Sequence, residues 1–151
     1  MSLCFEEVSL TPDILNTLIR FSADWEAENS CHGYRGNARE DIEGRRIFLA
    51  RQEGEIVAYG FGLLEEAERD NSIYPKGTKL FELEELYVIP AMRKQGVGKA
   101  LFSFIEEKVS DQAEMLMVST ATKNHKAILH FYLEEVGMEF WSARLYKPLK
   151  K

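Results

Sequence analysis

The sequence predicts an α/β (α+β) fold in which one mixed sheet, flanked by helices, combines antiparallel hairpin pairs with parallel crossover pairs. Three observations support this prediction. Strand-like and helix-like segments are interspersed along the chain, two consecutive strand-like segments meet at a tight-turn signal, and no linker, repeat or low-complexity tract interrupts the order. A length of 151 residues suits one core, so residues 1–151 are expected to form a single domain.

The alternation of apolar and polar residues predicts the first strand, and capping residues predict the start of the first helix. Residues 3–9 form a strand-like segment. Thr11 is a suitable N-cap, Pro12 fits the first helical position, and Asp13 lies favourably at the positive end of the helix dipole. The apolar stripe that follows continues to about residue 27.

A loop and a hairpin are expected next. Residues 28–37 are polar and contain glycine, which indicates a loop, and a short helix is expected near 38–44. The apolar segments 46–52 and 55–64 flank Glu53-Gly54, a pair typical of tight hairpin turns. These two segments are therefore predicted to pair as antiparallel strands.

The second half continues with the charged segment 65–78, which is expected to be a loop or a short helical excursion. A strand follows over residues 79–89, and Pro90 ends it. A helix is predicted from Val97 to about Gln112, because its apolar residues keep helical spacing.

The end of the chain supplies three further elements. Residues 115–120 resemble a buried strand, since they are apolar on both parities. Residues 126–136 are predicted to be helical, with Gly137 as terminator. The aromatic-rich segment 138–149 is expected to form a closing strand.

Composition excludes several classes of function. The net charge of −6 argues against a nucleic-acid partner, which requires a basic patch, and is compatible with a cationic acceptor. Neither a membrane span nor a secretory signal is recognisable in the sequence. Cys4 and Cys31 form no CxxC pair, so we expect free thiols, a cytoplasmic location and no metal site.

The segment from Arg93 to Gly98 carries the clearest chemical signal. It reads Arg93-Lys94-Gln95-Gly96-Val97-Gly98, and it lies between a predicted strand and a predicted helix. The two glycines allow tight backbone geometry and close ligand approach. The N–H groups at the start of the helix have no partner and carry positive partial charge, to which Arg93, Lys94 and Lys99 add formal charge. Together these features predict a pyrophosphate-binding site.

The wider segment ELYVIPAMRKQGVGKALF resembles the acetyl-CoA motif of the GNAT superfamily of N-acetyltransferases, with Arg93, Gly96 and Gly98 at its three defining positions. The resemblance extends to the element order over nearly the whole chain. It implies a centrally splayed sheet, acetyl-CoA as cosubstrate, and a pyrophosphate cradled by backbone N–H groups of Arg93 to Gly98. It also implies main-chain contacts from Leu86, Tyr87 and Val88 to the pantetheine arm.

A second segment, NHKAILHFYLEEVGM, resembles the family's later motif. Asn124 and Ala127 match this motif, and the resemblance makes Asn124 a coenzyme contact. Tyr132 matches the aromatic position of the motif in type, but it lies one residue further from both Asn124 and Gly137 than the family pattern has it. The resemblance makes Tyr132 the candidate acid that protonates the departing thiolate, and the alternative is packing against Phe131.

Direct attack on the thioester requires a neutral amine, so a base must remove its proton. Glu82 and Glu84 share one face of the predicted strand, whereas Glu85 points to the other face with Leu83 and Tyr87. Some small-amine enzymes of the family carry a glutamate at the position matching Glu84. The resemblance therefore favours Glu84 as the general base and keeps Glu85 as the alternative.

Other groups complete the expected mechanism. The N–H of Val88 is the candidate for polarising the thioester carbonyl, by the same resemblance. Three histidines could also act as bases. Of these, His125 and His130 are expected to face solvent, while His32 lies in the loop that shapes the acceptor pocket in the family.

The expected acceptor is a primary amine of a small molecule or peptide, more specifically a cationic small molecule. Its specificity is expected to lie in residues 22–37 and 65–80, where the candidates are Trp25, Glu26, Glu28, Tyr34, Glu65, Glu66 and Glu68. A non-catalytic acyl-CoA-binding sensor and a nucleotide-binding regulatory domain are the competing interpretations. A homodimer is left open.

Overall fold

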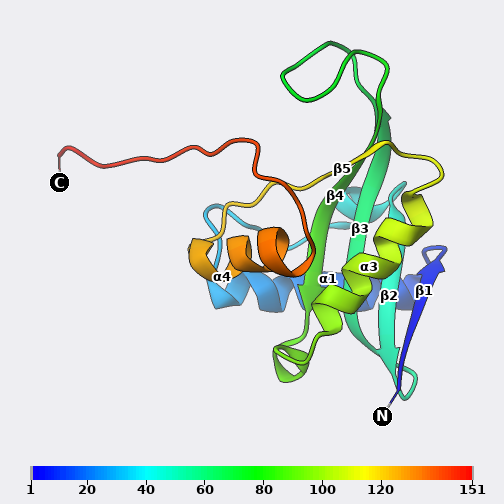
Figure 1. The fold of residues 1–151 in the computed structure, drawn as a ribbon. Coiled ribbons are helices and arrows are strands. Elements are labelled where there is room, and N and C mark those ends of the chain that lie inside the picture. The colour runs from blue at the N-terminus through cyan, green and yellow to red at the C-terminus, as the bar shows by residue number, and fades with distance from the viewer. Residues whose placement is uncertain (1, 151) are drawn as a thin grey trace.

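The computed structural model describes residues 2–150, which form one five-stranded sheet with helices on both faces (Figure 1). The strands follow the order β1-β2-β3-β4-β5 across the sheet. They are β1 (Leu3–Val8), β2 (Arg46–Gln52), β3 (Glu55–Glu66), β4 (Lys79–Val88) and β5 (Met115–Met117).

One long helix covers each face of the sheet: α3 lies over one face and α1 over the other (Figure 1). The helical elements are α1 (Pro12–Glu28), α2 (Arg39–Ile42), the 3₁₀ turn η1 (Pro90–Met92), α3 (Val97–Val109), α4 (His125–Leu129) and the π-helical η2 (His130–Glu135).

The sheet is mixed, as the sequence predicts. Neighbours from β1 to β4 are antiparallel, whereas β5 runs parallel to β4 because α3 forms the crossover between them. The β2–β3 hairpin turns at Glu53 and Gly54, whose φ angles are +53° and +83°. Positive φ at both central residues of a two-residue turn matches the right-handed twist of the strands.

The predicted start of α1 is confirmed in detail. The Ile14 N–H donates to Thr11 Oγ1 at 3.2 Å, and Pro12 occupies the first turn. The helix ends at Asn29, which has a left-handed φ of +53°.

Two apolar cores lie on opposite faces of the sheet. The core under α3 includes Phe48, Phe81 and Leu83, and the core under α1 includes Tyr59 and Tyr87. Both cores reach β4, so this strand connects the two halves of the hydrophobic interior.

The prediction of a closing strand over residues 138–149 is wrong. Within the described part of this segment, which ends at Lys150, no strand forms, and the chain extends away from the sheet (Figure 1). The residues after Gly137 cross towards the β3–β4 loop, where Trp141 Nε1–H donates to Ser72 Oγ at 2.8 Å. A strand requires a neighbour for its backbone groups, and this path does not run along β5.

Two other boundaries differ from the sequence prediction. Strand β5 has only three residues, because its pairing with β4 ends at Met117. The last helix is α-helical only to Leu129 and then continues as a π-helix. No helix among residues 2–150 is long and apolar enough to cross a membrane.

Candidate functional site

A cleft of about 630 Å³ opens where β4 and β5 separate. The two strands pair only between Leu80–Glu82 and Met115–Met117, and β4 continues to Val88 without β5 beside it. The backbone edge that β5 leaves uncovered forms one wall of the cleft. The pair β4/β5 is therefore splayed, as the sequence resemblance implies.

The backbone of β4 presents alternate residues to this cleft. The Ile89 N–H donates to Val57 O of β3 at 3.0 Å, so the peptide groups of Ile89 face the sheet. Because N–H and C=O groups of alternate strand residues point to opposite edges, those of Leu86 and Val88 face the cleft. Tyr87 turns its peptide groups to β3 and its ring into the core under α1.

A β-bulge at Glu84 changes which side chains share a face. Phe61 pairs with Glu85 and Gly62 with Leu83, so Glu84 is the extra residue of β4. Leu83 consequently packs under α3, whereas Tyr87 packs under α1. The sequence predicts that Leu83 shares a face of β4 with Glu85 and Tyr87. This prediction is wrong, because the bulge at Glu84 places Leu83 on the opposite face from Tyr87.

Glycine is required opposite the bulge. A Cβ atom at Gly62 would lie 2.1 Å from the carbonyl oxygen of Glu82. This backbone contact leaves no room for any other residue, so Gly62 allows β4 to bulge against β3.

Glu84 lines the cleft, but its carboxylate is held by Arg45. Arg45 donates from Nε to Oε1 at 2.9 Å and from Nη2 to Oε2 at 3.3 Å. The hydrogen bond to Glu84 raises the pKa of Arg45. Both carboxylate oxygens of Glu84 thus accept hydrogen bonds from the Arg45 guanidinium, which stays positively charged.

Glu85 occupies a different environment on the α1 face. Its Oε1 accepts hydrogen bonds from Tyr59 OH at 2.8 Å, Asn37 Nδ2 at 2.9 Å and Tyr34 OH at 3.1 Å. Burial raises the pKa of the Glu85 carboxyl, against the lowering effect of these three donors. We call Glu85 with Tyr34, Asn37 and Tyr59 the carboxylate end of the cleft.

The segment from Arg93 to Lys99 forms the other end, which we call the loop end. Lys94 and Gly96 have φ angles of +62° and +81°, and Gly96 is the N-cap of α3. Helical bonding begins where the Ala100 N–H donates to Gly96 O at 3.0 Å. The N–H groups of Val97, Gly98 and Lys99 therefore precede the first helical bond and present positive partial charge.

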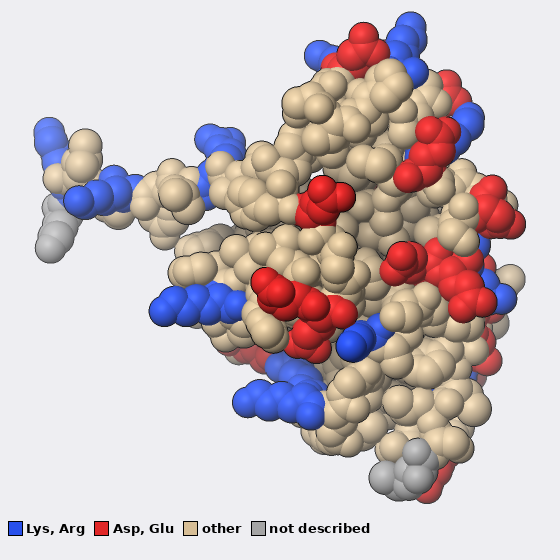
Figure 2. Space-filling model, in the orientation of Figure 1, with Lys and Arg blue, Asp and Glu red and all other residues tan. Residues whose placement is uncertain are grey.

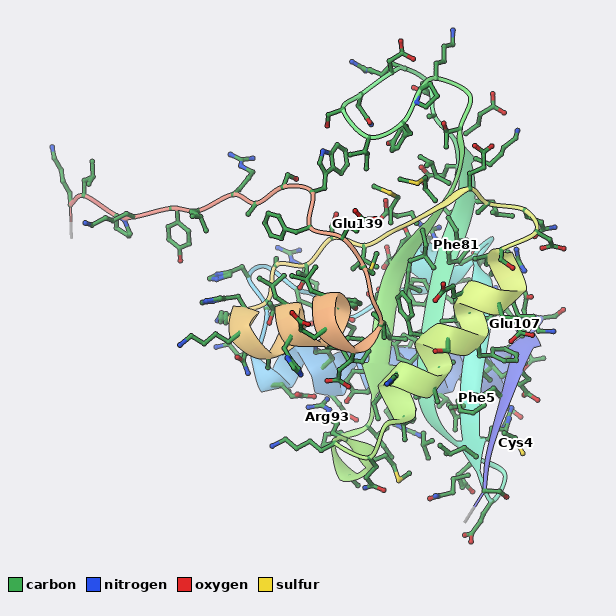
Figure 3. The ribbon with its side chains drawn as sticks, in the orientation of Figure 1. Cys4, Phe5, Phe81, Arg93, Glu107 and Glu139 are labelled. Atoms are coloured by element: carbon green, nitrogen blue, oxygen red, sulfur yellow. The ribbon has the colours of Figure 1, made fainter. Side chains whose placement is uncertain are left out.

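Arg93 is an anchor of this loop (Figure 3). Its Nη atoms donate to Glu28 at 2.7 and 2.8 Å, and its Nε donates to Val88 O at 2.9 Å. The guanidinium also lies 5.3 Å from the centre of the Tyr87 ring. Arg93 thus ties α1, the end of β4 and the loop together, and much of its charge is already paired.

The other coenzyme residues predicted from the sequence line the cleft, with the exception of Gln95. Gln95 Nε2 instead donates to Ala91 O at 3.2 Å. Asn124 lines the cleft and caps α4, where its Oδ1 accepts from the Ala127 N–H at 3.4 Å. The cleft therefore brings together backbone groups of β4, the loop end and Asn124.

Tyr132 reaches the cleft from the π-helix η2. The Val136 N–H donates to Phe131 O at 3.0 Å, a five-residue step that accommodates one residue more than an α-helix would. This extra residue gives a structural reason for the unusual spacing between Asn124, Tyr132 and Gly137. Burial raises the pKa of Tyr132 to about 12, so its hydroxyl keeps its proton at neutral pH.

Two residues of the carboxylate end, Asn37 and Tyr59, are not predicted as site residues from the sequence. Asn37 and Tyr59 are 48 and 26 residues from Glu85. No local spacing connects them. The pairing of β3 with β4 brings Tyr59 to Glu85, whereas Asn37 lies in the loop after α1, where its N–H donates to Ser22 Oγ at 2.7 Å. Tyr34 was expected to contact the acceptor, and it also donates to Glu85.

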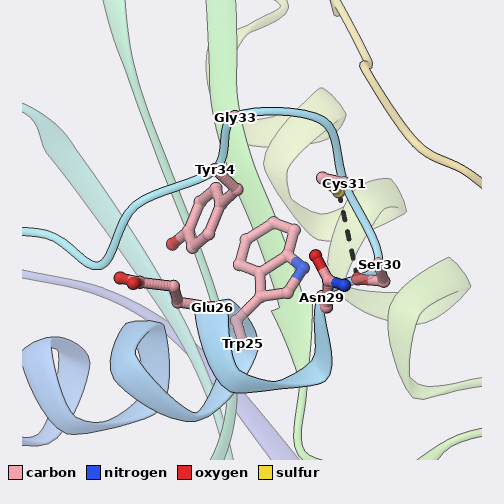
Figure 4. Close-up of a pocket in the computed structure, with 7 residues that line it drawn as sticks. All are labelled: Trp25, Glu26, Asn29, Ser30, Cys31, Gly33 and Tyr34. Carbon is pink, nitrogen blue, oxygen red and sulfur yellow. Dashed lines mark hydrogen bonds between the residues drawn. The ribbon is translucent and has the colours of Figure 1, made fainter. Parts of the chain in front are cut away.

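A smaller hollow of about 320 Å³ adjoins the cleft and shares Trp25, Ser30, Cys31 and Tyr34 with it (Figure 4). The rings of Trp25 and Tyr34 lie 4.5 Å apart. Glu26 also lines this hollow, and its Oε1 accepts from the Gly36 N–H at 2.6 Å. An aromatic pair beside a carboxylate suits a cationic ligand.

The histidines divide as the sequence predicts. His32 lines the cleft, whereas His125 and His130 are exposed. Among residues 2–150, no group of three or more His, Cys, Asp or Glu side chains is placed to hold a metal ion.

Comparison with known proteins identifies the family. Residues 14–138 match the model of the acetyltransferase (GNAT) family. No curated protein matches the chain in sequence.

Solved structures share the fold. An aminoglycoside acetyltransferase, meta-AAC0020, from an uncultured soil metagenomic sample is 21% identical, with a TM-score of 0.67 over 98% of this chain and 97% of that one. A putative acetyl transferase from Pyrococcus furiosus is 14% identical, with a TM-score of 0.68. The match covers 98% of this chain and 100% of that chain. Aminoglycoside N-acetyltransferase AAC(6')-Iy in complex with CoA is 14% identical, with a TM-score of 0.63. The match covers 98% of this chain and 100% of that chain.

Proposed function

The chain belongs to the acetyltransferase (GNAT) family, and we propose that it transfers the acetyl group of acetyl-CoA to a primary amine of a small molecule or peptide. The observation that carries this proposal is a single cleft with two chemically distinct ends. The loop end offers backbone N–H groups and helix-dipole charge for a pyrophosphate, and the carboxylate end offers a half-buried proton acceptor, Glu85.

The coenzyme is proposed to lie along the open edge of β4. The backbone groups of Leu86 and Val88 would hydrogen-bond the pantetheine arm as a missing strand does, with the N–H groups of the loop end on the pyrophosphate. Asn124 would contact the coenzyme from the opposite wall. Lys94 and Lys99 supply cations that are less constrained than the paired Arg93.

The transfer step is proposed as a direct attack. The amine nitrogen bonds to the thioester carbon, and the N–H of Val88 stabilises the developing oxyanion. The intermediate collapses with cleavage of the carbon–sulfur bond. Tyr132 donates its proton to the leaving thiolate, and a β4 carboxylate accepts the proton of the amine.

Two carboxylates of β4 remain candidates for the base. The family resemblance selects Glu84, but both of its oxygens are bound by Arg45. Glu85 keeps Oε2 outside its three hydrogen bonds, and burial raises the pKa of its carboxyl above the ordinary value. The environment therefore favours Glu85 as the base, with Glu84 attracting and orienting the cationic amine.

The acceptor is proposed to be a cationic amine, because Trp25, Tyr34 and Glu26 line the hollow beside the cleft (Figure 4). Glu84 adds a carboxylate to the lining of the cleft, and both Glu84 and Glu65 lie near Glu82. Burial, together with the negative charges of Glu65 and Glu84, raises the pKa of Glu82.

The test is thiol release from acetyl-CoA, measured with a panel of a monoamine, a polyamine, an aminoglycoside, an amino acid and a peptide with a free N-terminus. We expect amine-dependent release with at least one cationic member. Binding of acetyl-CoA without turnover across the panel would favour the sensor. Tighter binding of ATP than of CoA would favour the nucleotide-binding domain.

A further inference from the structure

The loop that joins α1 to α2, residues 29–38, is fixed to the α1 side of the cleft. The Asn37 N–H donates to Ser22 Oγ at 2.7 Å, and the fully buried Ser22 donates in turn to Ile19 O at 2.8 Å. The Gly36 N–H donates to Glu26 Oε1 at 2.6 Å. Because a buried hydroxyl is costly to leave unpaired, these bonds hold the second half of the loop in place.

The first half of the loop is fixed to the opposite wall of the cleft, in the chain between β5 and α4. The His32 N–H donates to Ala121 O, and the Lys123 N–H donates to Ser30 O, both at 2.8 Å. The loop therefore crosses the cleft and is held on both sides. Tyr34 lies between these two sets of anchors, so the backbone fixes its position.

Two side chains of this loop converge on one oxygen of Glu85. Tyr34 OH and Asn37 Nδ2 donate to Glu85 Oε1 at 3.1 and 2.9 Å, and Tyr59 OH donates to the same atom at 2.8 Å. A carboxylate oxygen has two lone pairs, so three donors saturate Oε1. Oε2 is then the oxygen that is left to accept a proton from an amine in the cleft, which Glu85 lines.

Tyr34 also forms part of the hollow beside the cleft. Its ring lies 4.5 Å from that of Trp25, and both residues line the hollow and the cleft. One side chain thus connects the surface that we propose for the cationic acceptor with the carboxylate that we propose as the base.

We propose that Tyr34 is a positioning residue for the transfer step: its hydroxyl holds Glu85 so that Oε2 is presented to the amine. The proposal rests on the proposed function, because it takes Glu85 as the base. Tyr59 holds the same oxygen from the fully buried core under α1, whereas Tyr34 is only half-buried. The Tyr34 hydroxyl is therefore the donor that can be removed without disturbing the core.

The surroundings of Glu85 give this role a signature in pH. Burial raises the pKa of the Glu85 carboxyl, and the negative charge of Glu84 raises it further. The hydrogen bonds from Tyr59, Asn37 and Tyr34 lower it, because they stabilise the ionised form. Loss of one of these donors should therefore raise the pKa of Glu85.

The other charges near the cleft do not change when a tyrosine is replaced by phenylalanine. On α1, Glu26 accepts from a backbone N–H and Glu28 is paired with Arg93, while Arg45 is paired with Glu84. The net charge of the chain is −6, and Figure 2 shows groups of Asp and Glu side chains over the body of the molecule. Since the replacement is neutral, a displaced pKa reports the lost hydrogen bond.

The first test is the steady-state kinetics of Tyr34→Phe with the most active member of the amine panel. We expect kcat to fall about tenfold, with KM for the amine kept because the ring remains. The acidic limb of the pH profile should move to higher pH. The control is Tyr146→Phe, which removes the hydroxyl of a tyrosine that is 77% exposed and should change neither quantity.

The second test requires no turnover. The Glu85 carboxyl is titrated by NMR in protein with ¹³C-labelled glutamate, and its signal is assigned by its absence in Glu85→Gln. We expect a higher pKa in Tyr34→Phe and the wild-type pKa in Tyr146→Phe, with circular dichroism as the control for folding.

The outcomes separate the positioning role from the proposed base. An unchanged pKa of Glu85 in folded Tyr34→Phe would overturn the proposal. So would a raised pKa with wild-type kcat, or loss of kcat in Glu85→Gln with wild-type kinetics in Tyr34→Phe, and in these cases Glu85 stays the base. Full kcat in Glu85→Gln would refute the base itself and the positioning role with it.

Discussion

The loop end and the carboxylate end of the cleft are built in different ways. At the loop end, a glycine N-cap and the first turn of α3 create the binding groups from consecutive residues. At the carboxylate end, Tyr34, Asn37 and Tyr59 reach Glu85 from two other parts of the chain. The first arrangement follows from local sequence, whereas the second depends on the pairing of β3 with β4 and on the packing of the α1–α2 loop against them.

This difference has functional consequences. The loop end presents backbone groups, so most side-chain changes there should be tolerated unless they fill the site. The carboxylate end presents one side chain held by three donors, so a single atom should matter.

The largest effect is expected at Gly98. A Cβ at this position would lie 3.5 Å from Phe131 and 3.6 Å from Val88, which is ordinary contact. Gly98→Ala should therefore bind acetyl-CoA nearly as the wild type does, whereas Gly98→Trp should lose binding because the indole fills the cleft. Calorimetric titration measures both, with circular dichroism as the control for folding. Wild-type affinity in a folded Gly98→Trp protein would mean that the coenzyme lies elsewhere.

The next effect is expected at Glu85. Glu85→Gln should lower kcat by about 100-fold, in the range typical of a lost general base. Glu84→Gln should raise KM with kcat largely kept, because its carboxylate is bound to Arg45. Loss of kcat in Glu84→Gln alone would return the role of base to Glu84.

The pH profile sharpens this test. Glu85 acts as a base only when ionised, so activity should fall as pH decreases through its pKa. Burial raises that pKa, and the acidic limb should therefore lie above the ordinary value of 4.5 for a glutamic acid. The limb should disappear in Glu85→Gln and remain in Glu84→Gln.

A smaller effect is expected at Tyr132. Tyr132→Phe removes the hydroxyl and keeps the ring contact with Phe102, whose centre lies 6.3 Å away. We expect kcat to fall by about tenfold while the affinity for acetyl-CoA is kept. Steady-state kinetics and calorimetry separate the two quantities, and an unchanged kcat would limit Tyr132 to packing.

The smallest effect is expected for the pair between Arg93 and Glu28. The two side chains are 39% and 26% exposed, so their ion pair should contribute about 1 kcal/mol or less to the free energy of unfolding. In a double-mutant cycle with Arg93→Gln and Glu28→Gln, the affinity for acetyl-CoA should change only a few-fold. A loss of more than a hundredfold in Arg93→Gln alone would instead show direct binding of phosphate by Arg93.

The sequence predicts most of the fold because most of its signals are local. The Thr11 cap, the Glu53-Gly54 turn and the loop end all depend on neighbouring residues, and each is present in the structure. The spacing around Tyr132 was visible as a departure from the family pattern. The spacing by itself does not indicate its structural counterpart, the π-helix η2.

The remaining features depend on distant partners. The bulge at Glu84 arises from the fit of β4 against Gly62, and it reverses the face on which Glu85 and Tyr87 lie relative to Leu83. Strict alternation along β4 cannot reveal it. The segment 138–149 has the composition of a strand but finds no neighbour within the described chain, so pattern alone predicted pairing that this chain does not form by itself.

We propose that the open edge of β4 and the loop end together hold acetyl-CoA. Amide hydrogen exchange of the full-length protein, with and without acetyl-CoA, tests it most directly. We predict slower exchange at Leu86, Val88 and residues 94–99 on binding, and little change in β1 and β2. Binding that leaves these amides unchanged, or that protects a different part of the sheet, would mean that acetyl-CoA lies elsewhere.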